Sequence, residues 1–235
     1  MADVVHLNYL LVPVMNRFGI KLGFGDQTIE EVCEKQNINV EFFLEIINAS
    51  HDKNYFPKKQ LKGFPIKLIV DYLRTSHYDY TRQKLPFIAK NIADLTSSQQ
   101  SAQTTLLLLQ TFFNEYQKDL LTHTGYEDKM IFPYVLEVEK AFLEKKADSE
   151  LLLKIKDHFI NKYAANHTNL ENKLYDLKNL IIKYLTPIGN SVLYDSVLFE
   201  LFKLENDLHE HARIEDKVLF PRILAMEKEI VNSQK

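Results

Sequence analysis

Two stretches of this 235-residue chain repeat one chemical pattern, a histidine followed four residues later by a glutamate. His123 and Glu127 begin the first stretch, and His211 and Glu215 begin the second, 88 residues further on. Over the 18 positions that start at each histidine, nine residues are identical, as a duplicated helical hairpin would produce. Imidazole and carboxylate groups four residues apart share one face of a helix, where they can bind a metal ion.

Each His–Glu pair replaces two apolar residues in a seam with steps of four and three residues, which predicts a core-facing helix. The first seam consists of Leu109, Phe113, Tyr116, Leu120, His123, Glu127 and Met130. The second consists of Val197, Leu201, Leu204, Leu208, His211, Glu215 and Val218. A buried carboxylate is costly unless it is paired or bound to a metal, so the two glutamates need a common partner.

Two more histidines continue apolar seams in the other long periodic segments. His77 follows Ile66, Val70 and Leu73, and His167 follows Leu153, Ile160 and Tyr163. The four seam histidines are spaced by 46, 44 and 44 residues. At a rise of ~1.5 Å per residue, antiparallel helices would bring His123, His167 and His211 to nearly one height, with His77 fitting less closely.

The predicted site therefore contains six ligands: His77, His123, Glu127, His167, His211 and Glu215. This number exceeds what one tetrahedral zinc needs and suits two metals, with Glu127 and Glu215 bridging and two histidines on each ion. Such a site leaves room for a bridging oxygen and an open position. Iron is the first choice, with manganese and zinc as alternatives. Ferritin-like sites use more carboxylates, so this set favours small ligands such as O₂ or NO over iron storage.

Other polar residues near the pattern are predicted to lie outside the set of metal ligands. His158 and His209 face away from the seams, while His6 and His51 precede the periodic segments, so these four are predicted to lie at the surface. Asp128 and Asp216 follow the glutamates; they can accept a ring N–H from a ligand histidine or only pair with lysine. Tyr126 and Tyr163 are predicted to pack, with hydrogen-bond donation to a metal ligand as the alternative. Pro133 and Pro221 are predicted to kink their helices.

The periodic segments predict an all-α protein. Residues 1–50 read as a small helical N-terminal domain with a capping box at Thr28 and Glu31, and 51–65 as a basic linker. Four long segments follow, at roughly 66–95, 98–143, 149–185 and 191–231. Short connections between them predict an antiparallel four-helix bundle over 66–235.

Composition excludes several classes of protein. Of the 235 residues, 29 are Lys or Arg and 32 are Asp or Glu, which gives no electrostatic reason to expect nucleic-acid binding. No apolar run approaches the ~20 residues that span a bilayer, and no signal peptide is readable, so we expect a cytoplasmic protein without membrane contact. The single cysteine, Cys33, excludes an intramolecular disulfide and a thiolate metal cluster.

On the six predicted ligands and their spacing, the chain resembles the hemerythrin-like HHE cation-binding domains, and more specifically the repair-of-iron-centres family of di-iron proteins. The resemblance extends to the N-terminal helices, where that family typically carries a Cys-Cys pair within a glycine-rich stretch before a Thr-Leu-Glu-Glu helix. Here the corresponding stretch is Gly19–Gly25, followed by Thr28, and it contains no cysteine.

The resemblance implies a stress-response protein with two iron ions that helps repair iron–sulfur clusters after oxidative or nitrosative damage, with NO or O₂ chemistry at the centre. Its partners would be diatomic ligands and damaged iron–sulfur proteins. The alternative is a reversible O₂ or NO carrier or sensor that uses the same site, which the missing cysteines favour. A metal-free structural bundle is the third hypothesis. Catalytic turnover, as opposed to binding, is left open.

Overall fold

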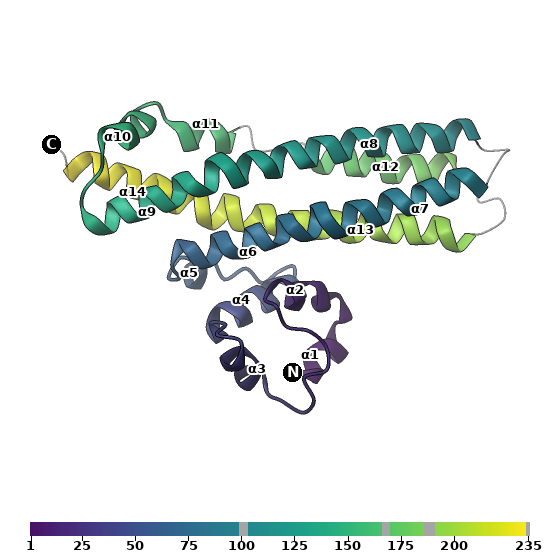
Figure 1. Cartoon of the computed structure of the whole chain (residues 1–235), viewed down its shortest axis with the longest axis horizontal. Coiled ribbons are helices and arrows are strands. Elements are labelled where there is room, and N and C mark those ends of the chain that lie inside the picture. The colour runs from purple at the N-terminus through teal and green to yellow at the C-terminus, as the bar shows by residue number, and fades with distance from the viewer. Residues whose placement is uncertain (99–102, 166–169, 186–190, 234–235) are drawn as a thin grey trace.

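The computed structural model describes residues 1–98, 103–165, 170–185 and 191–233. Every regular element in these ranges is helical, which confirms the all-α prediction (Figure 1). No helix among them combines the length and the apolarity that a membrane crossing requires.

The N-terminal part consists of short helices that begin at recognisable caps. They are α1 (Ala2–Leu7), the 3₁₀ turn η1 (Tyr9–Leu11), α2 (Val12–Arg17), α3 (Ile29–Lys35), α4 (Val40–His51) and α5 (Lys58–Leu61). The predicted capping box is present: the Thr28 hydroxyl accepts from Glu31 N at 3.1 Å, and Thr28 N donates to the Glu31 carboxylate at 2.8 Å. Asn39 caps α4 by accepting from Phe42 N.

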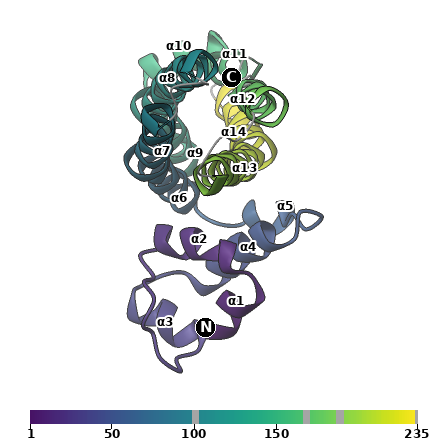
Figure 2. The same cartoon turned by 90° about the vertical axis from the view of Figure 1, so that its right-hand side faces the viewer.

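The bundle helices surround one axis, which the end view in Figure 2 shows. The first comprises α6 (Ile66–Asp79), η2 (Tyr80–Lys84) and α7 (Leu85–Ser98); the second comprises α8 (Gln103–Tyr126), η3 (Glu127–Ile131) and α9 (Phe132–Glu144). The fourth comprises α13 (Ser191–Ile214), η4 (Glu215–Leu219) and α14 (Phe220–Ser233). The third consists of α10 (Ser149–Lys156), α11 (Phe159–Ala165) and α12 (Leu170–Tyr184).

The third helix differs from the prediction of one segment over 149–185. The helix stops at Lys156, and His158 adopts a left-handed backbone conformation with φ of 55°. A left-handed residue cannot continue a right-handed helix, so the chain turns before α11 begins. The change of direction leaves Leu153, predicted for the seam, 67% exposed, whereas Ile160 is buried as expected.

Three π turns, η2, η3 and η4, occur in the described parts of the other bundle helices, and a proline is the second residue after each of them. The residue before that proline donates its N–H to the carbonyl five residues back: Leu85 to Tyr80, Phe132 to Glu127 and Phe220 to Glu215. Since Pro86, Pro133 and Pro221 have no N–H, they cannot close the next α-helical bond. A wider turn thus stands where a kink was predicted at Pro133 and Pro221.

The π turn η3 also shifts the buried face, whereas Val218 in η4 is fully buried as the seam predicts. A π turn holds more residues than an α turn, so the residue that faces the core after Glu127 is one position later than a 3.6-residue period predicts. Met130, assigned to the seam from the sequence, is 49% exposed, and Ile131 is fully buried in its place.

Two hydrophobic cores lie within the described part of the chain. The first, the lower core, joins the N-terminal helices to α6, α9, α10, α11 and α14, and the second, the upper core, lies among α7, α8, α12 and α13. Along the second helix, Leu120 belongs to the upper core and Ile131 to the lower core. His123 and Glu127 lie between them. The predicted domain boundaries at 50 and 65 remain a prediction, since the lower core contains residues from both sides of them.

Glu227 of α14 is a buried carboxylate that accepts a hydrogen bond from the Tyr134 hydroxyl. Burial raises the pKa of Glu227, and the Tyr134 bond offsets this only in part. The ionised form is therefore penalised by folding. The stability that protonated Glu227 contributes is fully present at pH values below its pKa in the unfolded chain. It is lost as the pH rises through the raised pKa of the folded chain.

We expect Glu227→Gln to raise the melting temperature at pH 8 by a few degrees, because a gain of about 1 kcal/mol corresponds to roughly 2–4 °C in a chain of this size. The gain should shrink as the pH falls toward 5. Thermal unfolding followed by circular dichroism at both pH values measures it, with exposed Glu229→Gln as the matched control. An equal change at both pH values would contradict the burial argument.

Candidate metal centre

Glu127 and Glu215 are the first residues of π turns η3 and η4, and both are fully buried. They lie between the two cores, together with His77 of α6 and His211 of α13. We call the level of the bundle that these four side chains occupy the polar layer. One ligand atom from each of these four residues lies within 4.8 Å of the other three. The duplicated pattern thus places its two carboxylates together.

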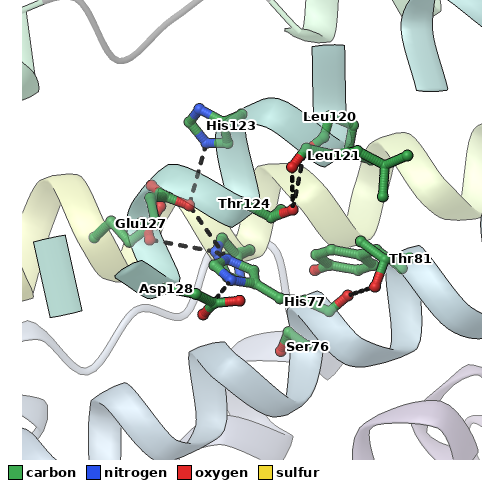
Figure 3. A network of polar contacts seen from close by, with 12 residues as sticks. Ser76, His77, Thr81, Leu120, Leu121, His123, Thr124, Glu127 and Asp128 are labelled. Carbon is green, nitrogen blue, oxygen red and sulfur yellow. Dashed lines mark hydrogen bonds and ion pairs between the residues drawn. The ribbon is translucent and has the colours of Figure 1, made fainter. Parts of the chain in front are cut away.

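Close contacts join the imidazoles and carboxylates of this group. His77 Nε2 lies 3.1 Å from His211 Nε2 and 3.2 Å from Glu127 Oε2. His211 Nε2 lies 3.3 Å from Glu215 Oε1. Figure 3 shows His77 and Glu127 turned toward each other from neighbouring helices. Four donor atoms on three helices therefore face one small space.

The other two predicted ligands differ in position. His123 lies at the edge of the group, where its Nε2 is 3.3 Å from Glu127 Oε2 and its side chain is 24% exposed. His167 lies outside the described residues. The histidines predicted to lie at the surface, His6, His51, His158 and His209, are all exposed.

Asp128 holds the far side of the His77 ring. His77 Nδ1 lies 3.0 Å from Asp128 Oδ1 (Figure 3), which is the outer-shell role the sequence left open for this residue. Burial alone would lower the pKa of His77, but Asp128, Glu127 and Glu215 outweigh it and raise the pKa to about 9. Surroundings that hold a proton this firmly also favour a cation. For Asp216, the corresponding role remains a prediction.

Tyr163 of α11 contacts the centre directly, in the donor role that the sequence offered only as the alternative to packing. Its hydroxyl donates to Glu127 Oε1 at 2.7 Å. Burial and the Glu127 charge raise the pKa of Tyr163 far above its usual range, so the hydroxyl stays protonated and remains a donor. Its ring stacks on Tyr126 and His123 and meets Phe220 edge-on. No helical period distinguishes this hydroxyl from a packing tyrosine.

Aromatic rings complete the walls. Phe132 stacks on His77 with ring centroids 5.3 Å apart, and Tyr80 meets His211 edge-on at 5.7 Å. Phe132 and Phe220 occupy equivalent positions of the repeat, each after a π turn. These rings keep the ligand side chains among apolar neighbours.

The donor set fits a metal cation. Two imidazole nitrogens 3.1 Å apart match the ~3.0 Å that separates two ligands at right angles around an ion at about 2.1 Å. Histidine and glutamate together suit iron, manganese or zinc. Two fully buried carboxylates gain from a positive partner in a way that no apolar core offers.

We expect Asp128→Ala to weaken metal binding by about 10- to 100-fold, because His77 would lose the acceptor that fixes its ring. Competition with a chelator of known affinity measures the change. Asp71→Ala, an exposed aspartate on the same helix as His77, is the matched control and should bind as the wild type does. Equal affinity in all three proteins would refute the role given to Asp128.

Comparison with known proteins agrees with this geometry. The family model for the hemerythrin HHE cation binding domain matches residues 68–223. The iron-sulfur cluster repair protein ScdA of Staphylococcus haemolyticus is 21% identical over 222 residues, which cover 93% of this chain and 95% of that protein. The iron-sulfur cluster repair protein YtfE of Escherichia coli is 23% identical over 208 residues, 86% of each chain. The chain therefore belongs to the hemerythrin HHE cation-binding family.

Proposed function

We propose that this protein holds two iron ions in the polar layer and helps repair iron–sulfur clusters damaged by oxidative or nitrosative stress. Relatives named as iron-sulfur cluster repair proteins support this, because the similarity covers the N-terminal helices as well as the bundle. The observation that carries the proposal is the convergence of His77, Glu127, His211 and Glu215 in a buried layer.

The number of donors supports the proposal of two ions. Glu127 contacts both His77 and His123, whereas Glu215 contacts His211. Each carboxylate has two oxygens, and Glu127 Oε1 keeps one lone pair beside the bond from Tyr163, so both glutamates would be able to bind two ions. His167 is the fourth histidine in this proposal.

Bound iron would supply redox and Lewis-acid chemistry toward a diatomic ligand such as NO or O₂. The chain's own groups prepare the site for it. Asp128 fixes the His77 ring, and the Tyr163 hydroxyl holds one oxygen of Glu127 and leaves the other toward the histidines. The rings of Phe132 and Tyr80 limit the space for water.

A reversible NO or O₂ carrier or sensor is the second candidate. Cys33 is free and fully buried, and the Gly19–Gly25 loop contains no thiol, so the described N-terminal helices offer no accessible sulfur. A role confined to ligand binding needs none. We place either activity in the cytoplasm, where Cys33 would stay reduced.

Protein made in iron-replete cells should contain about two iron ions per chain, measured by elemental analysis of the purified full-length chain. Glu127→Ala and Glu215→Ala should each lose most of this iron, because each removes a bridging carboxylate. Glu227→Gln, a buried carboxylate of the fourth helix outside the centre, should keep it. Less than one metal per chain, unaffected by either alanine variant, would refute the di-iron proposal.

Repair and carriage differ in what the protein does to a damaged client. We expect the iron-loaded chain to restore activity to a [4Fe–4S] enzyme inactivated by NO, and the Glu127→Ala chain to restore none. A carrier would bind NO with an optical change and leave the client inactive. Iron released by the inactivated enzyme alone, without this protein, sets the background.

A further inference from the structure

Arg17 is a buried charge that the N-terminal helices insert into the bundle. It is the last residue of α2, and its side chain is only 2% exposed. Its guanidinium donates to Asp207 Oδ1 at 2.7 Å and to Asp79 Oδ2 at 2.8 Å, with a further short contact to Asp207 Oδ2. Asp79 ends α6 and Asp207 lies in α13, so one side chain joins two bundle helices (Figure 1 shows α2 beside them).

The two aspartates lie next to metal-site histidines along the chain. Asp79 follows His77 by two residues, and Asp207 precedes His211 by four, which is about one helical turn. Lys84 also contacts Asp207, so two cations balance two carboxylates. Burial alone would raise the pKa of Asp207, but Arg17 and Lys84 hold it well below its usual range. Without Arg17, two carboxylates whose side chains are each only 15% exposed would share one cation.

Tyr80 connects this charge cluster to the metal centre. Its ring lies 5.2 Å from the Arg17 guanidinium on one side and meets the His211 ring edge-on at 5.7 Å. Its hydroxyl donates to the Asp207 backbone carbonyl at 3.3 Å. Tyr80 is fully buried, so its position follows from these contacts.

The His211 ring depends on Tyr80 for its orientation, and the His77 ring does not. Asp128 accepts from the His77 ring, but His211 Nδ1 is buried and has no hydrogen-bond partner among the described residues. No acceptor at Nδ1 fixes the far side of the His211 ring, and packing against Tyr80 takes that part.

We propose that Arg17 is a positioning residue that, through Tyr80, holds His211 in the orientation that binds metal. The N-terminal helices would then set how firmly the bundle retains its ions. This inference rests on the proposed metal centre, but it does not depend on the repair reaction.

The test uses the full-length chain loaded with Co²⁺, whose visible absorption reports ligand geometry without any catalytic assay. EDTA should remove Co²⁺ about tenfold faster from Arg17→Met and from Tyr80→Leu than from the wild type, the low end of the effect of outer-shell changes. Their cobalt bands should also shift. Arg17→Lys keeps the charge without the forked contact and should fall in between.

Lys178→Met is the matched control. Lys178 of α12 is also a buried cation. It pairs with Glu205 of α13, the helix that carries Asp207 and His211, but it contacts neither Tyr80 nor His211. The Lys178→Met variant should have a lower melting temperature than the wild type and should release Co²⁺ at the wild-type rate. Equal acceleration in Lys178→Met and Arg17→Met would overturn the proposal, since the effect would then be general loosening.

Release at the wild-type rate from folded Arg17→Met and Arg17→Lys would also overturn it. If Arg17→Met does not fold, Arg17→Lys and Tyr80→Leu decide in the same way. A wild-type chain that fails to hold Co²⁺ would refute the metal centre and this inference together. Absent repair activity alongside faster release from the Arg17 variants would refute only the repair function.

Discussion

The burial of two carboxylates in the middle of an apolar bundle is the constraint on which the rest of this structure depends. Glu127 and Glu215 are fully buried, and charge in such a place is costly without a positive partner. The imidazoles of the polar layer and the hydroxyl of Tyr163 offset part of this cost. Asp128 fixes the orientation of one of these imidazoles, that of His77. A cation supplies the charge that these groups together favour.

The π turns are part of the same solution. Each of η3 and η4 begins at a buried glutamate, and a proline is the second residue after the turn. The proline removes a helical hydrogen bond, and the wider turn re-forms one to the glutamate's own carbonyl. π turns often occur at functional sites. Here the duplicated Phe-Pro sequence places one at each carboxylate, so the local backbone and the ligand were copied together.

The helical spacing of apolar residues predicted much of this molecule, because most of the bundle consists of regular α-helix. The seams through Leu109 and Val197 are buried, and the repeat brought both glutamates and His211 together. The prediction was wrong where the backbone leaves the 3.6-residue period. A π turn exchanged Met130 for Ile131, and the left-handed His158 ended a helix that sequence pattern continued. Neither change has a strong signal, since proline marks a disturbance without giving its form.

Contacts between distant segments were beyond the same reasoning. Arg17 and Asp207 are separated by 190 positions, and no spacing rule links a short N-terminal helix to the fourth bundle helix. Tyr163 likewise reads as a packing residue until its hydroxyl is seen against Glu127. Both residues act through a polar atom at the end of a long side chain, and a pattern of apolar positions does not carry that information.

The division into two cores has a consequence for how the fold behaves as a whole. The upper and lower cores lie on opposite sides of the polar layer, where polar and charged side chains replace apolar packing. Three bundle helices pass through this layer and already link the two halves. An ion bound to His77, Glu127, His211 and Glu215 would tie the same three helices to one another, so loss of the ion would remove a cross-link at a level where apolar packing is interrupted.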